Sequence, residues 1–239
     1  MRVKLNKVNE LSIIIPIYNE GNNILLLSQK IQNNISIKKY QIIFVDDNSD
    51  DDTFKNFLHL KKKNKNTRLI LRKNIKRDLS KSCILGFKKA RYKFIMVMDG
   101  DLQHDPKYIR KFISFYNKKN SDLIIGCRSI FGKSNNGLNF IRSLMSKFLI
   151  VFLNTMLGKK TKDPMSGFFL FDKKIFLKSK KKLFGNGYKI LADLIYSSEN
   201  NLKINDINIS FKKRIYGESK MNFTILLLLL KFIFARLLR

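Results

Sequence analysis

Short apolar runs alternate with amphipathic segments along the first half of the chain. Apolar runs bounded by turn residues are typical of buried strands, and apolar positions spaced three and four residues apart are typical of helices. The predicted strands are 11–17, 40–45, 68–71, 94–98 and 122–126, and the predicted helices are 22–35, 54–62, 81–90 and 107–117. This alternation predicts an α/β fold with a mostly parallel sheet flanked by helices. No repeat or low-complexity linker interrupts it, so we expect one domain over residues 1–220.

Polar residues follow three of these strands. The first strand leads into Tyr18-Asn19-Glu20, the second into the acidic run 46–52, and the fourth into Asp99-Gly100-Asp101. Open α/β sheets bind ligands at the carboxyl ends of their strands. Two carboxylates two residues apart, with the Gln103 amide two further on, suit a hard divalent cation that also holds phosphate oxygens. The alternative is a solvated turn that starts a helix at Asp105-Pro106.

Two later segments differ from this pattern. Residues 139–157 predict an apolar helix in which Arg142 and Ser146, four apart, share one face; its apolar stripe could also be core. Residues 221–239 have only 225–230 as an uninterrupted apolar run near Lys231, far short of the ~20 residues that a bilayer span needs. We expect this C-terminal helix to lie in the membrane surface rather than to pack in the core.

Charge and composition narrow the function classes. The formal net charge of +30 is compatible with nucleic acid, anionic lipid or phosphorylated substrates, and a low-GC coding bias would produce part of the same excess. No RNA-recognition box or zinc finger accompanies the charge, so we expect no nucleic-acid partner. The chain has two histidines, which argues against histidine metal clusters and Ser-His-Asp catalysis. Cys83 and Cys127 match no metal-ligand spacing, and we expect both to be buried thiols.

Other motifs exclude two classes of nucleotide enzyme. No GxGxxG motif follows the first strand, which argues against a dinucleotide-binding fold. Gly132-Lys133-Ser134 imitates the end of a P-loop, but Cys127 occupies the position that requires the first glycine. The N-terminal segment lacks the apolar core of a signal peptide, so we expect a location on the cytoplasmic side.

An ordered series of motifs remains, and it closely resembles glycosyltransferase family 2 in its dolichol-phosphate (polyprenyl-phosphate) mannose synthase branch. The resemblance covers about residues 11–220 and implies a GT-A fold. It rests on Pro16-Ile17-Tyr18-Asn19-Glu20, Val45-Asp46-Asp47-Asn48-Ser49, Asp99-Gly100-Asp101-Leu102-Gln103-His104, Gly126-Cys127-Arg128, Asp163-Pro164-Met165-Ser166-Gly167-Phe168, Gly187-Tyr188-Lys189, and Arg214 with Gly217-Glu218-Ser219-Lys220.

The resemblance also implies a role for each matching residue. The nucleotide site would comprise Pro16, Tyr18, Asn19, Glu20, Val45, Asp47, Asp99, Gly100, Lys189, Arg214 and Lys220, with Ser219 in the same closing set. The metal site would comprise Asp99, Asp101 and Gln103, holding Mg²⁺ or Mn²⁺. The acceptor phosphate would lie against Arg128, Arg142 and Ser146. The candidate catalytic residues are Asp99, Asp101, Arg128 and Arg214. One departure is that the segment before Arg142 lacks the family's usual Trp.

The implied reaction is inverting, metal-dependent transfer of a sugar from a nucleoside-diphosphate sugar, with GDP-mannose favoured, to a polyprenyl monophosphate. A phosphomonoester is largely ionised at neutral pH and needs positioning more than deprotonation. A hydroxyl acceptor would instead need a general base, for which Asp105 and His104 are the nearest candidates. The alternatives are transfer to a glycan or lipid hydroxyl, and a non-catalytic basic module that binds membranes or nucleic acid. We expect a peripheral protein on the cytoplasmic face of a membrane, attached by residues 221–239 or through a membrane-protein partner.

Overall fold

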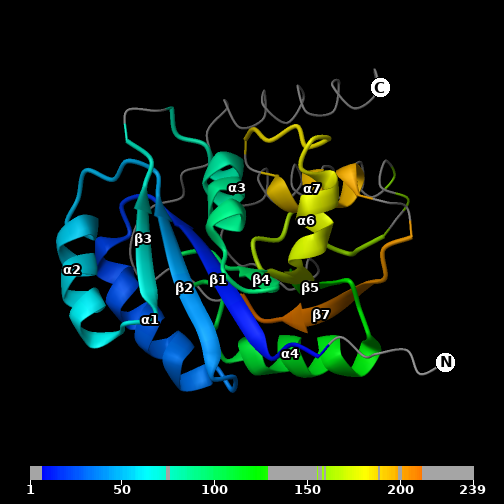
Figure 1. Ribbon diagram of the computed structural model, residues 1–239, viewed down its shortest axis with the longest axis horizontal. Helices are drawn as coiled ribbons and strands as arrows, with labels where there is room; N and C mark the ends of the chain where they lie inside the picture. The colour runs from blue at the N-terminus through cyan, green and yellow to red at the C-terminus, as the bar shows by residue number, and fades with distance from the viewer. Residues whose placement is uncertain are drawn as a thin grey trace, which may run out of the picture.

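A seven-stranded sheet forms the centre of the computed structural model (Figure 1). The structure describes residues 7–73, 76–128, 155, 158, 160–187, 189–198 and 201–211. The strands are β1 (Glu10–Ile17), β2 (Lys39–Asp46), β3 (Thr67–Leu71), β4 (Phe94–Val97), β5 (Leu123–Arg128), β6 (Phe169–Asp172) and β7 (Ile204–Ile209). The helices are α1 (Gly21–Asn34), α2 (Thr53–Lys63), α3 (Leu79–Lys89), α4 (Tyr108–Lys119), α6 (Lys173–Ser179) and α7 (Ile190–Ser197).

The strand order is β3-β2-β1-β4-β6-β5-β7. Every neighbouring pair is parallel except those of β6, which runs antiparallel to both β4 and β5. The five strands and four helices predicted between residues 11 and 126 are all present, and their ends agree within two residues. The prediction of a mostly parallel α/β sheet is therefore confirmed.

Strands β6 and β7 and helices α6 and α7 were not among the predicted elements. Strand β6 is only four residues long, and α6 begins directly after it. Strand β7, INDINI, has partly exposed polar residues in its first half. Both strands form because β5 provides a partner on each side, and the local sequence does not reveal that pairing.

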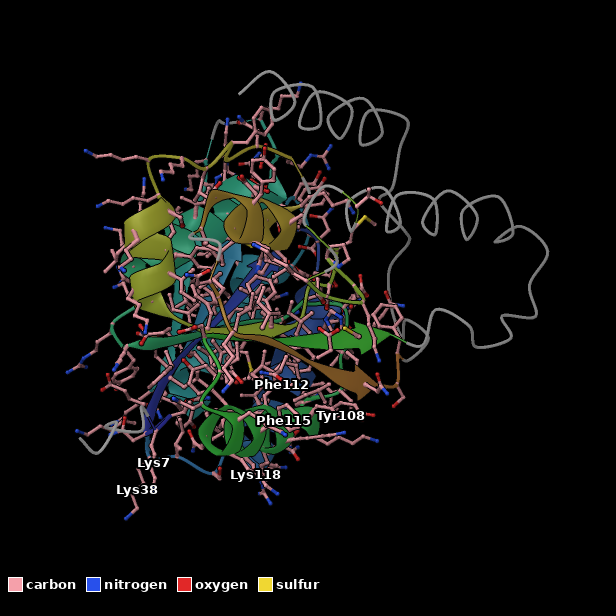
Figure 2. The ribbon with its side chains drawn as sticks, turned by 90° about the vertical axis from the view of Figure 1, so that its right-hand side faces the viewer. Lys7, Lys38, Tyr108, Phe112, Phe115 and Lys118 are labelled. Carbon is pink, nitrogen blue, oxygen red and sulfur yellow. The ribbon has the colours of Figure 1, made fainter. Side chains whose placement is uncertain are left out.

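Two apolar layers cover the two faces of the sheet. Alternate residues of a strand point to opposite faces, so Ile13 and Ile15 contribute to one layer and Ile14 to the other. Helices α1, α2 and α4 pack on the first face, and α3, α6 and α7 on the second (Figure 1). Figure 2 shows Phe112 of α4 on the sheet side of its helix and Lys118 on the opposite side. Both faces of the sheet are therefore apolar and covered by helices.

Both cysteines are buried and free, as predicted. Burial is the main cause that raises the pKa of the Cys127 thiol to about 12, and burial also raises the pKa of Cys83 far above its usual range. Within the described residues, no helix is both long enough and apolar enough to cross a bilayer.

Candidate active site

The carboxyl ends of β1, β2 and β4 lie side by side in the middle of the sheet. Strand β1 pairs with β2 on one side and with β4 on the other, and all three are parallel. Pro16 is opposite Val45 in this register, so two predicted nucleotide-binding positions are direct neighbours. The Asp47 N–H donates to the Ile17 carbonyl (2.9 Å), and the Met98 N–H to the Ile14 carbonyl (3.1 Å). The loops after these strands therefore meet at one edge, as expected for an open α/β sheet.

The loop after β1 is shaped by the acidic loop after β2. The Asn19 amide donates to Asp50 Oδ1 (2.6 Å), and its oxygen accepts from the Asp50 N–H (3.1 Å). Asn19 has φ +53°, a left-handed conformation that asparagine tolerates better than most residues. The Asn19 side chain thus fixes the path of the loop beside Tyr18. The ring of Tyr18 lies against Arg77, whose guanidinium carbon is 4.2 Å from the ring centroid.

Glu20 and Asp50 lie near the starts of α1 and α2, but neither caps a helix with its side chain. Glu20 occupies the N-cap position of α1 but makes no side-chain cap bond; its carboxylate accepts from the Asn23 amide at 2.6 Å. Asp51 ties the two helix starts together, because it accepts from the Gly21 N–H (3.0 Å) and the Thr53 N–H (2.9 Å). Burial opposes the charge of Asp51, but the hydrogen bonds from Thr53 and Gly21 outweigh it and lower the pKa.

Asp47 is part of a buried ion pair that the sequence did not predict. The guanidinium of Arg72, which directly follows β3, donates to Asp47 Oδ1 and also to the Asp78 carbonyl (3.1 Å) and Ser82 Oγ (3.0 Å). The two side chains are 5% and 9% exposed. Burial is the largest influence on Asp47 and raises its pKa, although the Asp78 N–H and Arg72 act in the opposite direction. In the sequence, Arg72 is recognisable only as a basic residue at the end of a predicted strand, which does not indicate its partner.

The turn after β4 presents the predicted metal ligands. The Gln103 N–H donates to Asp101 Oδ1 (3.1 Å), and Leu102 between them has φ +61°. A branched apolar residue rarely adopts this conformation, so the turn is held by its surroundings. A Cβ on Gly100 would lie 2.8 Å from Ile17 Cγ2, so glycine lets the turn pack closely against the end of β1.

His104 supports this turn from inside the protein. Its Nδ1 accepts from the Asp99 N–H (3.3 Å) and lies 3.4 Å from Asp99 Oδ2. The residue is 1% exposed, with ring centroids 5.2 Å from Phe168 and 5.3 Å from Phe211. A backbone bridge also joins His104 to Phe211. His104 is therefore placed to hold the backbone of Asp99 rather than to meet solvent.

Gly167 underlies the same carboxylate. A Cβ at this position would lie 2.4 Å from Asp99 Oδ2 and 2.5 Å from Oδ1. Ser166 holds the adjacent backbone, because its hydroxyl donates to the Gly126 carbonyl (2.7 Å). The sequence motif contained Gly167, but only the structure shows that it makes room for Asp99.

The oxygen donors of the turn fit a divalent cation that is also held by phosphates. Among the described residues, no group of three or more His, Cys, Asp or Glu side chains forms a ready-made metal site. Mg²⁺ in nucleotide enzymes is commonly bound through one or two carboxylates and the substrate phosphates. The carboxylates of Asp99 and Asp101 and the amide of Gln103 are donors of the type that such a partial site uses.

A comparison with known families decides the classification. The model of "Glycosyl transferase family 2" matches residues 12–179. The chain belongs to glycosyl transferase family 2.

Relatives within this family are named dolichol-phosphate mannosyltransferase. That of Pyrococcus furiosus is 35% identical and is matched over 89% of this chain but 59% of its own length. Those of Mycosarcoma maydis and Saccharomyces cerevisiae are 30% and 31% identical, and the chain spans 73% and 81% of their lengths. The chain therefore spans less than two thirds of the archaeal relative and more of the two fungal ones.

Solved structures share the GT-A fold of this family member. Glucosyl-3-phosphoglycerate synthase from Mycobacterium tuberculosis, crystallised with Mn²⁺ and UDP, has a TM-score of 0.71. The alignment covers 96% of this chain and 79% of that protein at 16% sequence identity. The fold class predicted from the sequence is confirmed.

The remaining predicted site residues of this glycosyl transferase family 2 chain are placed only in part. Lys189 occupies the N-cap position of α7, and the backbone of Arg128 ends β5 opposite Ile209. The side chain of Arg128 lies outside the described part of the structure. So do most of the predicted helix 139–157 and the whole C-terminal helix 221–239. The predicted residues Arg142, Ser146, Tyr188, Arg214, Ser219 and Lys220 also fall outside the described residues.

Proposed function

We propose that this chain transfers a sugar, with mannose favoured, from a nucleoside-diphosphate sugar to a polyprenyl monophosphate. The observation that carries the proposal is the name shared by three relatives at 30–35% identity, all dolichol-phosphate mannosyltransferases. GDP-mannose is the favoured donor for the same reason. The polar edge formed by the ends of β1, β2 and β4 supplies a site of suitable chemistry.

In this mechanism the loops after β1 and β2 hold the nucleoside. The pair of Asp47 and Arg72 would recognise the base, since the carboxylate accepts from base N–H groups and the guanidinium is a planar donor. Tyr18 and Glu20 border the same loop. Lys189 would act on the diphosphate as a compact positive charge, and Arg214 and Lys220 complete the proposed basic set.

Asp99, Asp101 and Gln103 would hold a divalent cation, Mg²⁺ or Mn²⁺, which neutralises charge on the leaving diphosphate. His104 holds the Asp99 backbone for this role, and the missing Cβ of Gly167 leaves room for the Asp99 carboxylate. Arg128, Arg142 and Ser146 would bind the acceptor phosphate, an oxygen of which attacks the anomeric carbon opposite the diphosphate. The glycosidic bond breaks with its electrons passing to the diphosphate, and the configuration inverts.

The surroundings of His104 and Asp105, the nearest candidate general bases, favour a phosphate acceptor over a hydroxyl acceptor. His104 is 1% exposed and lies between two aromatic rings. Asp105 accepts from the Lys107 N–H (3.0 Å) and lies 3.7 Å from the Lys107 ammonium. Neither residue is arranged to take a proton from an incoming alcohol, whereas an ionised phosphate needs no such base.

The test offers radiolabelled nucleotide sugars, including GDP-mannose and UDP-glucose, with polyprenyl phosphate and Mg²⁺ or Mn²⁺. We expect label from one donor in the organic phase, lost with EDTA and in Asp101→Ala. Asp122→Ala is the matched control, because Asp122 precedes β5 at the opposite edge of the sheet and should leave transfer unchanged. Failure of every donor with folded protein would exclude a polyprenyl-phosphate acceptor.

We also infer that the protein acts at the cytoplasmic face of a membrane, attached peripherally through residues 221–239 or through a membrane-protein partner. Flotation with vesicles containing anionic lipid tests the first route. Flotation of the full chain that is lost when residues 221–239 are deleted would support attachment by this segment. Full-chain protein that stays at the bottom of the gradient would contradict it.

A further inference from the structure

Asp78 links two parts of the chain that are far apart in sequence. Its carboxylate accepts from the Lys81 N–H (3.0 Å), which caps α3, and from the Gly187 N–H (2.8 Å). Its backbone N–H donates to Asp47 Oδ2 (2.6 Å), and its carbonyl accepts from Arg72 (3.1 Å). The residue is 8% exposed, so these bonds form largely out of water. Asp78 therefore contacts both members of the buried ion pair and a segment 109 residues away.

The distant segment that Asp78 contacts, residues 184–187, is held by several hydrogen bonds. The Ser80 N–H donates to the Gly187 carbonyl (2.8 Å), so Gly187 is bound through both its N–H and its carbonyl. Gly187 has φ +86°, a conformation that glycine adopts without strain. Asp193 of α7 accepts from the Phe184 N–H (3.0 Å) and the Gly185 N–H (2.8 Å). The segment 184–187 is thus pinned between α3 and α7.

Lys189 lies shortly after this segment in the chain. It is two residues beyond Gly187 and forms the N-cap position of α7. Two residues of chain span at most about 7 Å, so the position of Gly187 limits where the Lys189 backbone can lie. The Asp78 bond therefore sets the distance between Lys189 and the pair formed by Asp47 and Arg72.

We propose that Asp78 is a positioning residue that holds Lys189 in register with the base-binding pair, so that one nucleotide meets both. This inference rests on the proposed function, in which Asp47 and Arg72 take the base and Lys189 the diphosphate. Asp78 itself contacts neither ligand; it acts through the Gly187 backbone. Its loss should therefore weaken recognition of the phosphates and leave recognition of the nucleoside intact.

Serine at position 78 separates the two roles of the carboxylate. A serine hydroxyl is a good N-cap and can still accept from the Lys81 N–H. It is too short to reach the Gly187 N–H as well. Asp172→Ser is the matched control, because Asp172 is the buried N-cap of α6 and accepts from the Lys174 N–H (2.9 Å). Asp172 is paired with the first residue of β4, at the edge opposite the site.

Calorimetric titration of the full chain with GDP and with guanosine, at constant Mn²⁺, separates the affinity for the diphosphate from the affinity for the nucleoside. UDP and uridine serve as a second pair. In Asp78→Ser we expect the Kd for the diphosphate to rise about tenfold, the loss of a charge-assisted contact, and the nucleoside Kd to change less than about twofold. In a Lys189→Ala background the added Asp78→Ser change should have no further effect on diphosphate binding. Asp172→Ser should change neither Kd.

Equal weakening of diphosphate and nucleoside binding would overturn the inference. So would an Asp78→Ser effect that persists in the Lys189→Ala background. Should Asp78→Ser fail to fold, Asp78→Asn replaces it, since its single carbonyl oxygen cannot serve both N–H donors, and the same outcomes decide. If the wild-type chain binds neither diphosphate, the proposed function fails and the inference with it; diphosphate binding with an unchanged variant rejects the inference alone.

Discussion

A methyl group added at Gly167 would collide with the carboxylate of Asp99. The new Cβ would lie 2.4 Å from Oδ2, whereas ordinary contacts begin at 3.4 Å. The carboxylate must therefore retreat by about 1 Å. Gly167→Ala introduces no other obvious strain, because the backbone of Gly167 is not in the left-handed region.

The displacement should affect activity more than stability. The Asp99 side chain is 34% exposed and can swing toward solvent, so we expect the free energy of unfolding to fall by less than about 1 kcal/mol. Misplacing a catalytic group by 1 Å can cost about 10²-fold in rate, which corresponds to about 2.7 kcal/mol of activation free energy. We therefore expect kcat/KM for sugar transfer to fall about 100-fold.

Gly86→Ala is the control, because it introduces a similar steric clash in the apolar core, away from Asp99. A Cβ at Gly86 would lie 2.3 Å from Ile14 Cγ2, in the apolar layer between α3 and the sheet. Overpacking of this kind costs about 1–3 kcal/mol of stability. Urea denaturation should show the larger loss for Gly86→Ala, and transfer assays at a temperature where both variants are folded should show the larger loss for Gly167→Ala.

Two results would refute this reasoning. The first is a Gly167→Ala enzyme that keeps its kcat/KM within about threefold of wild type, because Asp99 would then not need its observed position. The second is a loss of activity that follows the loss of stability equally in both variants. Either result would show that Gly167 contributes to packing and not to the position of a catalytic group.

Three further predictions concern an ion pair, the two thiols and the aspartate that joins the starts of α1 and α2. Arg72→Met leaves Asp47 buried without its cationic partner, so urea denaturation should show a loss of about 3–5 kcal/mol; an unchanged midpoint would contradict the ion pair. Burial raises the pKa of Cys83 and Cys127, so both thiols stay protonated at pH 8, and mass spectrometry should find iodoacetamide labelling only after unfolding; labelling of native protein would contradict their burial. Hydrogen bonds lower the pKa of Asp51, so its contribution is present above pH 3.8 and is lost as the pH falls through the folded pKa. Asp51→Asn should therefore lower Tm at pH 7 but have a smaller effect near pH 2, and an equal effect at both would reject this account.

Local patterns in the sequence were sufficient for the first half of the fold. Apolar runs such as 11–17 and 94–98 end in polar turns, and both features depend on residues close together in the chain. The same patterns placed the acidic turns of Asp47 and Asp99 at strand ends, and the parallel register then brought these turns to one edge. The family was also apparent from the order of its motifs.

Pairings between distant residues were decided only by the tertiary structure. Strand β6 enters the sheet between β4 and β5 although it follows both in sequence. Arg72 meets Asp47 across 25 residues, and Gly187 meets Asp78 across 109. Gly167 lies under Asp99 because β6 starts beside the end of β4. Such contacts depend on strand order, register and loop path, whereas the periodicity of a segment reflects only its own burial. For this reason the sequence determined the segments and their polar ends, and the assembled sheet determined which side chains meet there.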